Sequence, residues 1–381
     1  MKSDKQVEVV LIGINGYGKN YLRLLLERVD ASLIGVVEIA AEKSSFFSVL
    51  QERSIPIYTT IEDFYENHSA ELAIISTPIH LHTKQAVYAM EQGSHVLCEK
   101  PLTGDPADLP LWKKTSEESG KWAAIGFNWS FTESIQSLKR DIMSDLFGEP
   151  IQLKTLVLWP RTEDYYHRSS WAGKKYSPDG TLIMDSIANN ATAHFLHNMF
   201  YMLGDRMETS IPVKDVEAQL YRANEIETFD TCVVKMQTVQ GAELLFFASH
   251  AVEESEGPIF HYEFEKGVIT FNSEDEQPSM RAEFNDGTIK EYGNPHGPHT
   301  DKLNWCLKAV HDLEATPPCD YSTAAVHVQV LGELNAQLDL VKEFPEELKR
   351  FDSATKLHYV ENVRKVLTDS YQKGTVPSQP F

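Results

Sequence analysis

The chain has 381 residues, of which 35 are Lys or Arg and 56 are Asp or Glu, so its formal net charge is −21 at pH 7. A strongly negative chain is repelled by nucleic-acid phosphates and by anionic lipid headgroups, which argues against both as partners. The apolar runs fall short of the ~18 residues that a membrane-spanning helix needs, and the length predicts about two or three domains.

The start of the chain and its cysteines predict a cytoplasmic protein. Residues 1–5 lead directly into an apolar run, without the regions of a secretory signal peptide. The cysteines are far apart and form no C-x-x-C pair, so we expect free thiols and neither disulfides nor a zinc site. They are Cys98, Cys232, Cys306 and Cys319.

The stretch from Val7 to Glu38 has the most informative pattern in the chain. Val7–Ile12 is a β-branched apolar run typical of a strand buried on both faces. The turn Gly13-Ile14-Asn15-Gly16-Tyr17-Gly18 follows it. An amphipathic helical pattern comes next, and then a second apolar run, Leu33–Val37, which leads to Glu38. Strand, glycine turn, helix, strand and acid in this order are typical of a dinucleotide-binding unit.

The glycine turn has the residues that pyrophosphate binding requires. Gly13 allows a tight turn, and Gly18 allows the helix to lie close to the strand. Asn15 replaces the usual middle glycine, but Asn tolerates left-handed backbone angles and Gly16 is beside it. An acid after the second strand accepts hydrogen bonds from ribose hydroxyls and repels a 2′-phosphate, so NAD is favoured over NADP. The alternative is a glycine turn in another α/β protein. The predicted cofactor residues here are Gly13, Asn15, Gly16, Tyr17, Gly18 and Glu38.

Strand and helix patterns continue to alternate as far as Ile125. Repeated β-α-β units with right-handed crossovers give a parallel sheet with helices on both faces. Ligands of such sheets bind beyond the carboxyl ends of the strands. The expected helices are 44–51, 61–66, 82–92 and 105–119, and the expected strands are 55–58, 72–76, 95–98 and 122–125.

Two of these strand ends carry reactive side chains. Ser76-Thr77-Pro78-Ile79-His80-Leu81-His82 follows one strand, and Glu99-Lys100-Pro101 follows the next. The prolines fix the direction of the backbone where the chain leaves the sheet. Lys100 is either an ordinary surface lysine paired with Glu99 or a functional residue beside a cofactor. Its position at a strand end favours a function.

These motifs resemble those of the Gfo/Idh/MocA family of oxidoreductases, named after glucose–fructose oxidoreductase and inositol dehydrogenase. The resemblance is carried by Gly13–Gly18, Ser76-Thr77-Pro78 with His82, the stretch Glu91–Leu102 and Gly126-Phe127-Asn128. It implies a Rossmann domain, residues 1–127, followed by an α+β domain, residues 128–381, with a large, mostly antiparallel open sheet. It also implies that Lys100 points between nicotinamide and substrate. Further residues predicted at the cofactor are Thr77, Pro78, His80, His82, Glu99, Lys100 and Asn128.

The second half of the chain is dominated by strand patterns. Ser130 or Thr132 is expected to cap a helix that runs to Leu146 and stops at Gly148, and two more helices are expected at 299–313 and 324–344. An open sheet of the expected size exposes apolar surface that a second subunit usually buries. We therefore expect a homodimer or homotetramer formed through this sheet. The expected strands are 151–159, 216–221, 231–238, 243–249, 260–264 and 268–271, with hairpin turns at 239–241 and 285–287.

The segment from Asp179 to Asn198 predicts part of a substrate site. From about Ile187 it has a helical pattern that is rich in Asn and His. Such a face either lines a cavity or carries buried polar groups that are satisfied within the fold.

The family resemblance assigns an acid and a histidine in this segment to the handling of substrate hydroxyls. Asp185 matches the acid, but Asn189 occupies the position of the histidine, and an amide takes no proton at neutral pH. Three alternatives remain open. Lys100 with Asp185 carries proton transfer, another histidine such as His194 supplies it, or the chemistry differs.

An aromatic and basic loop precedes this segment. It contains Trp159-Pro160-Arg161 and then Tyr165 to Lys174, a mixture typical of a carbohydrate site and also found in ordinary loops with anchoring aromatics. His167 is a candidate replacement base. No metal is expected, because hydride transfer from a secondary alcohol needs none. The predicted substrate contacts are Lys100, Asn128, Tyr166, His167, Arg168, Trp171, Asp185, Asn189 and His194, of which Lys100, Asp185, Asn189 and His194 are the catalytic candidates.

The sequence therefore predicts an NAD-dependent oxidoreductase that acts on a sugar, a cyclitol or a related polyol. One alternative is an enzyme that keeps NAD bound and uses transient oxidation for elimination or glycoside cleavage. Another is an NAD-dependent sensor or binding protein without catalysis.

Overall fold

A computed structural model describes residues 6–312 and 314–378 of the chain. They divide into two compact units. The first contains the described parts of Met1–Thr103, Ala107–Asn128 and His299–Ala324; the second contains those of Gly104–Pro106, Trp129–Pro298 and Ala325–Phe381. The sequence keeps residues 128–381 together, whereas this division places 299–324 with the first unit. Residues 1–5 and the predicted helix end at Leu313 lie outside the described residues.

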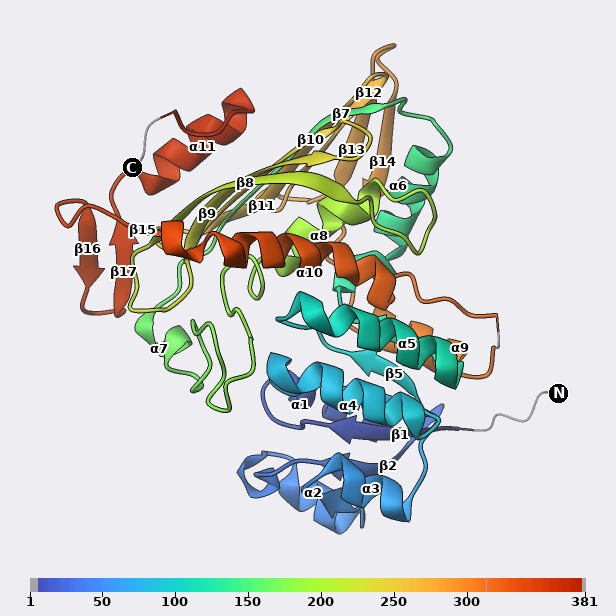
Figure 1. The fold of residues 1–381 in the computed structure, drawn as a ribbon. Coiled ribbons are helices and arrows are strands. Elements are labelled where there is room, and N and C mark those ends of the chain that lie inside the picture. The colour runs from blue at the N-terminus through green and yellow to red at the C-terminus, as the bar shows by residue number, and fades with distance from the viewer. Residues whose placement is uncertain (1–5, 313, 379–381) are drawn as a thin grey trace. The chain divides into compact units, whose positions relative to one another are not determined.

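The first unit has a parallel sheet of six strands within the described ranges, in the order β3-β2-β1-β4-β5-β6. Strands β1, β2 and β5 of this sheet are labelled in Figure 1. The strand order is that of a doubly wound dinucleotide-binding fold. The central strands of the sheet are apolar and buried on both faces, as their near-continuous hydrophobic sequences predict. The strands are β1 (Val7–Ile12), β2 (Ala31–Val37), β3 (Ile57–Tyr58), β4 (Leu72–Ile75), β5 (His95–Cys98) and β6 (Ala123–Ile125).

Local signals define the helices of the first unit. The Thr60 hydroxyl caps the third helix by accepting a hydrogen bond from the Asp63 amide at 3.1 Å. The fifth ends at Gly120, which has a left-handed φ of 66°. The helix expected at 44–51 begins only at Phe47. The helices are α1 (Gly18–Glu27), η1 (Ala41–Lys43), α2 (Phe47–Glu52), α3 (Ile61–Asn67), α4 (Ile79–Glu91), η2 (Pro106–Asp108), α5 (Leu109–Ser119) and α9 (Asp301–Ala309).

The second unit is built on a sheet of nine strands within the described residues, in the order β14-β13-β12-β11-β7-β10-β9-β8-β15. Only the pairs β7–β10 and β8–β15 are parallel in it, so the predicted α/β plus α+β fold class is confirmed. A two-stranded ribbon, β16–β17, is separate. The strands are β7 (Pro150–Leu158), β8 (Val213–Arg222), β9 (Thr231–Thr238), β10 (Glu243–Ser249), β11 (Glu256–Phe264), β12 (Gly267–Asn272), β13 (Met280–Phe284), β14 (Ile289–Gly293), β15 (Lys342–Glu343), β16 (Lys349–Asp352) and β17 (Leu357–Val360).

One face of the large sheet forms the main core of the second unit. Side chains such as Leu153, Val234 and Phe246 pack there with Leu138, Phe200 and others from the covering helices. Across the described ranges, each helix is too short or too polar to cross a membrane. The helices after the first domain are η3 (Asn128–Phe131), α6 (Glu133–Met143), α7 (Glu163–Tyr166), α8 (Ala193–Met202), α10 (Tyr321–Ala336), η4 (Leu338–Leu340) and α11 (Val363–Lys373).

The opposite face of this sheet differs from the exposed apolar surface that the sequence predicts. Leu245 and Phe247 of β10 are buried there against Val363, Leu367 and Tyr371 of α11. The last helix of the chain therefore covers the apolar part of the face. The outer positions farther along the sheet are polar and exposed, among them Thr270, Arg281 and Glu283.

Two predicted helices have different bounds in the structure. The helix expected from Ile187 begins only at Ala193. Before it, the side chains of Asn189 and Asn190 form hydrogen bonds with nearby loop atoms, and local hydrogen bonds of this kind compete with helix formation. The helix expected at 324–344 ends at Ala336, and residues 342–343 pair with β8. The predictions also missed β15 to β17 and α11, and gave the hairpin turn at 285–287 without the bounds of β13 and β14 that it joins.

Candidate functional site

The glycine turn leaves no room for side chains where the backbone turns. Gly13 has a φ of +84°, and a Cβ there would lie 2.6 Å from the carbonyl oxygen of Ser76. A Cβ at Gly18 would lie 2.0 Å from the carbonyl oxygen of Gly13. Gly16, by contrast, has a φ of +54° and faces open space. The turn therefore presents exposed backbone at the start of α1, as pyrophosphate binding requires.

Glu38 lies against this turn. Its carboxylate accepts hydrogen bonds from the amides of Ile14, at 3.1 Å, and Ala40, at 3.2 Å. The side-chain amide of Asn15 donates to the Ala40 carbonyl at 3.3 Å. The carboxylate is thus fixed beside the place where the ribose of a dinucleotide bound on the turn would lie, and the residues present fit such a cofactor.

His82 links the two reactive strand ends. It is buried, with Nδ1 2.8 Å from the Pro101 carbonyl and Nε2 3.0 Å from the Thr77 carbonyl. Burial lowers its pKa, although both carbonyl contacts act to raise it. His80 lies in the first turn of α4, next to Pro78, which precedes the helix. The predicted residues of this loop are therefore brought to the same sheet edge as Lys100.

Glu99 is the buried centre of a polar cluster. It accepts a hydrogen bond from the Tyr21 hydroxyl at 2.6 Å and forms an ion pair with Lys302 of α9. Burial by itself would raise the pKa of Glu99, but Lys302 and Tyr21 hold it below its ordinary value. The backbone amide of Lys100 lies 3.3 Å from the other carboxylate oxygen.

His299 is a residue of this edge that the sequence analysis missed. Its Nδ1 lies 3.1 Å from the hydroxyl of Tyr17 and 3.0 Å from the side-chain amide of Asn128. Burial, and then the charge of Glu99, raise the pKa of Tyr17. Two predicted cofactor residues are thus joined by a histidine from a distant part of the chain. A motif search cannot find it, because His299 lies just before α9, outside any recognised pattern.

In the second unit, Asp185 organises the loop that precedes α8. It is buried and accepts hydrogen bonds from the Gly173 amide at 2.7 Å and the Asn190 side chain at 2.6 Å. Its charge is paired with Arg168 at 3.3 Å. Asp185, which the sequence predicts as a substrate contact, therefore also holds three parts of the loop together.

Aromatic rings surround the two arginines of this loop. The guanidinium carbon of Arg168 lies 3.8 Å from the ring centre of Tyr165 and 5.0 Å from that of Trp171. That of Arg161 lies 5.0 Å from the same tyrosine ring. These are cation–π distances. Burial raises the pKa of Tyr166, so its phenol stays protonated and can donate a hydrogen bond. His167 follows α7 and is exposed.

The two remaining candidates have different surroundings. The Asn189 side chain is fully buried and donates to the carbonyls of Ile183, at 3.2 Å, and Met184, at 3.1 Å. These hydrogen bonds stabilise the loop. The contact of Asn189 with substrate stays a prediction. His194 lies in the first turn of α8. Among the described residues, no group of His, Cys, Asp or Glu has the arrangement of a metal site.

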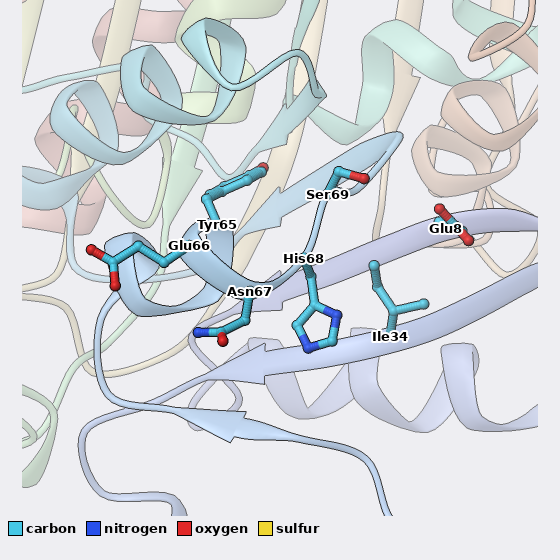
Figure 2. Close-up of a pocket in the computed structure, with 7 residues that line it drawn as sticks. All are labelled: Glu8, Ile34, Tyr65, Glu66, Asn67, His68 and Ser69. Carbon is cyan, nitrogen blue, oxygen red and sulfur yellow. The ribbon is translucent and has the colours of Figure 1, made fainter.

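A separate hollow of the first unit is shown in Figure 2. It is lined by residues at or near the starts of β1 and β4, such as Glu8 and Ser69, and by Tyr65 and His68. In a parallel sheet the starts of the strands lie at the edge opposite their carboxyl ends. This hollow is therefore distinct from the edge that carries the glycine turn and Lys100.

We expect the Asp185→Ala variant to be markedly less stable than the Asp185→Asn variant. Alanine removes the acceptor of the buried Gly173 amide, a loss that costs about 1–3 kcal/mol, and also the acceptor of the half-buried Asn190 side chain. Asparagine retains one acceptor and should cost roughly half as much. Urea denaturation followed by circular dichroism measures both, and equal stability of the two variants would contradict this role.

Comparison with known proteins agrees with the geometry of the first unit. Residues 7–127 match the Gfo/Idh/MocA model, described as "Oxidoreductase family, NAD-binding Rossmann fold". This match, over 121 of the 381 residues, confirms the predicted resemblance to that family of NAD-binding oxidoreductases.

Relatives with an assigned name match mainly in this domain. The chain is 25% identical over 148 residues to glucose-6-phosphate 3-dehydrogenase of Bacillus subtilis, covering 39% of this chain and 41% of the relative. It is 23% identical over 145 residues to 2,7-anhydro-N-acetylneuraminate hydratase of Mediterraneibacter gnavus, covering 38% of each. The matched part is thus about two fifths of each relative.

Solved structures extend the likeness to both units. The WlbA dehydrogenase of Bordetella pertussis, solved with NADH and UDP-GlcNAcA, gives a TM-score of 0.71 over 88% of this chain and 97% of that chain. Only 19% of the aligned residues are identical. This similarity shows the fold shared by the two chains.

Proposed function

We propose that the protein is an NAD-dependent oxidoreductase that transfers a hydride between nicotinamide and a carbon of a sugar, cyclitol or related polyol. One observation supports this most. The glycine turn, Glu38 and Lys100 converge on the carboxyl edge of one parallel sheet, in a domain of an NAD-binding oxidoreductase family.

Each group of residues has a role in this proposal. The nicotinamide, when bound, supplies hydride acceptance or donation. Lys100 donates a hydrogen bond to the reacting oxygen and stabilises the negative charge that develops on it. Glu38 accepts from the ribose hydroxyls, so NAD is preferred to NADP. Asp185 and His194 are the proposed acid and base partners, and the proposed sugar contacts are Asn128, Tyr166, His167, Arg168, Trp171 and Asn189.

A sugar-like substrate is supported by the named relatives. One is named glucose-6-phosphate 3-dehydrogenase, and a similar fold was solved with a nucleotide sugar. The arginines and aromatic rings of residues 159–174 provide the cation, hydroxyl and ring surfaces that bind such ligands.

The direct test is reduction of NAD and NADP across a panel of sugars, sugar phosphates, nucleotide sugars and cyclitols. We expect NADH formation with a member of the panel and a lower rate with NADP. Absence of turnover throughout the panel, with NAD binding retained, would favour the non-catalytic sensor.

A second candidate has its own supporting observation. A relative of similar identity is named a hydratase, and Asn189 occupies the position where the family has a histidine. An enzyme that keeps NAD bound and uses transient oxidation would release an elimination or hydrolysis product without net NADH. Product analysis by mass spectrometry alongside NADH absorbance separates the two candidates.

We also propose that the chain forms a homodimer or homotetramer through the large sheet. Since α11 covers the apolar part of the outer face, the interface would use the polar positions of β12 and β13. We expect light scattering after gel filtration to give two or four chain masses, and Arg281→Glu to give a smaller species with an unchanged circular dichroism spectrum. A wild-type monomer contradicts the proposal. The cytoplasmic location stays a prediction, to be tested by cell fractionation.

A further inference from the structure

The first unit contains a buried lysine that comes from a distant part of the chain. Lys302 lies in the first turn of α9, and its side chain is 1% exposed. A buried ammonium ion is costly unless it is paired and hydrogen-bonded. Here the carboxylate of Glu99 pairs with it. The partner is therefore the residue immediately before Lys100.

The surroundings of Lys302 leave its ammonium group little freedom. It lies 4.9 Å from the ring centre of Tyr17 and 5.4 Å from that of Tyr21. It is also 3.5 Å from the carbonyl oxygen of Gly126. A Cβ at Gly126 would lie 3.1 Å from both the lysine nitrogen and a Glu99 oxygen. The pocket is thus closely fitted to this ion pair.

Glu99 transmits this restraint to the reacting residue. One carboxylate oxygen accepts from Tyr21 and Lys302, and the other lies 3.3 Å from the backbone amide of Lys100. The carboxylate is therefore held on one side by α1 and α9 and on the other contacts the main chain of Lys100. Loss of Lys302 would leave the buried Glu99 carboxylate without its paired cation, and its charge would then act on Lys100, with which it already interacts electrostatically.

We propose that Lys302 is a positioning residue for hydride transfer, which acts by pairing with Glu99 so that the Lys100 side chain is kept for the substrate oxygen. This inference rests on the proposed function. Through the ion pair between Lys302 and Glu99, α9 would help to position Lys100 at the carboxyl edge of the first sheet.

The central test compares Lys302→Met with Lys308→Met, a matched change at an exposed position of the same helix. We expect Lys302→Met to lower kcat at least about tenfold at saturating NAD and substrate, since misplacement of a catalytic group has effects of this size. The Kd for NAD should stay within about threefold of the wild-type value. Lys308→Met should leave both unchanged.

A pH profile separates positioning from a purely structural pair. In Lys302→Met the buried Glu99 has lost its cation, so its pKa rises above the ordinary value. The kcat of this variant should fall as the pH rises through the raised pKa of Glu99, because the ionised carboxylate attracts Lys100. Lys308→Met should lack this step. The double variant Glu99→Gln with Lys302→Met should lose that step. The titratable groups around Glu99 are Tyr17, Tyr21, His82, Cys98, Lys100 and Lys302.

The double variant also keeps the test valid if Lys302→Met fails to fold, because it buries no unpaired charge. It should fold, bind NAD and retain a lowered kcat without the pH step. A kcat for Lys302→Met equal to that of Lys308→Met overturns the proposal. So does a parallel loss of NAD affinity and kcat, which indicates a structural role only.

Hydrogen exchange distinguishes failure of this inference from failure of the proposed function. If the wild-type protein shows no dehydrogenase activity, the proposed function has failed. The exchange rate of the Lys100 amide still reports positioning, and should rise at least about tenfold in Lys302→Met and not in Lys308→Met. An unchanged rate overturns the inference independently of activity.

Discussion

Replacement of Lys100 by Ala should lower the rate of hydride transfer at least about a hundredfold. Loss of a group that transfers a proton in the transition state lowers rates by about this factor or more. Binding of NAD should be nearly unchanged, because the glycine turn and Glu38 are the groups expected to hold its pyrophosphate and ribose. Stopped-flow measurement of NADH formation and fluorescence titration of NAD give the two quantities.

The matched control is Lys113→Ala, an exposed lysine of α5 whose contact with Glu117 is a surface ion pair. Such a pair contributes at most about 1 kcal/mol to stability, so this variant should turn over like the wild-type protein. If Lys100→Ala retains wild-type hydride transfer, the role assigned to Lys100 is wrong. The sensor alternative applies if the wild-type protein shows no turnover and Lys100→Ala leaves its response to ligand unchanged.

Replacement of Glu38 by Ala should reduce the preference for NAD over NADP by at least about thirtyfold. The change removes a carboxylate that repels a 2′-phosphate and accepts from ribose hydroxyls, and hydrogen bonds to charged groups contribute about 1.5–3 kcal/mol. Glu38 also accepts from the amides of Ile14 and Ala40, so the Kd for NAD should rise at least about tenfold through loss of order in the turn.

Two further variants separate these effects of Glu38. Glu38→Gln retains an acceptor for the turn but loses the charge, so it should change cofactor preference more than it changes NAD affinity. Glu42→Ala alters an exposed acid of η1 and should change neither. Steady-state kinetics with both cofactors measure the result. An unaltered preference in Glu38→Ala would mean that another group excludes the 2′-phosphate.

The first unit was predictable to a large extent because its information is local. Strand β1 and strand β5 have the predicted bounds, since buried apolar runs and turn residues are read directly from neighbouring positions. The glycine turn forms where it was predicted, but Gly16 and not Asn15 has the left-handed backbone angle. The constraint at Gly18 arises within one strand–helix connection, whereas that at Gly13 comes from Ser76, which follows β4.

The parts that were missed depend on residues far apart in the chain. Lys302 and His299 reach the edge of the first sheet through tertiary packing, and no spacing rule connects them with Glu99 or Asn128. The helix start at Ala193 was misplaced because Asn189 and Asn190 bond to loop atoms that periodicity does not reveal. The covered sheet face was missed because α11 was not predicted.

The return of residues 299–324 to the first unit has a consequence for biosynthesis. A ribosome that has released only the first 128 residues presents a nascent chain in which Glu99 lacks its cation. Completion of the nucleotide-binding half therefore waits until α9 has emerged, after most of the second half. A gene fragment ending near Asn128 should accordingly yield insoluble product, whereas one that joins α9 to it through a short linker should yield soluble product.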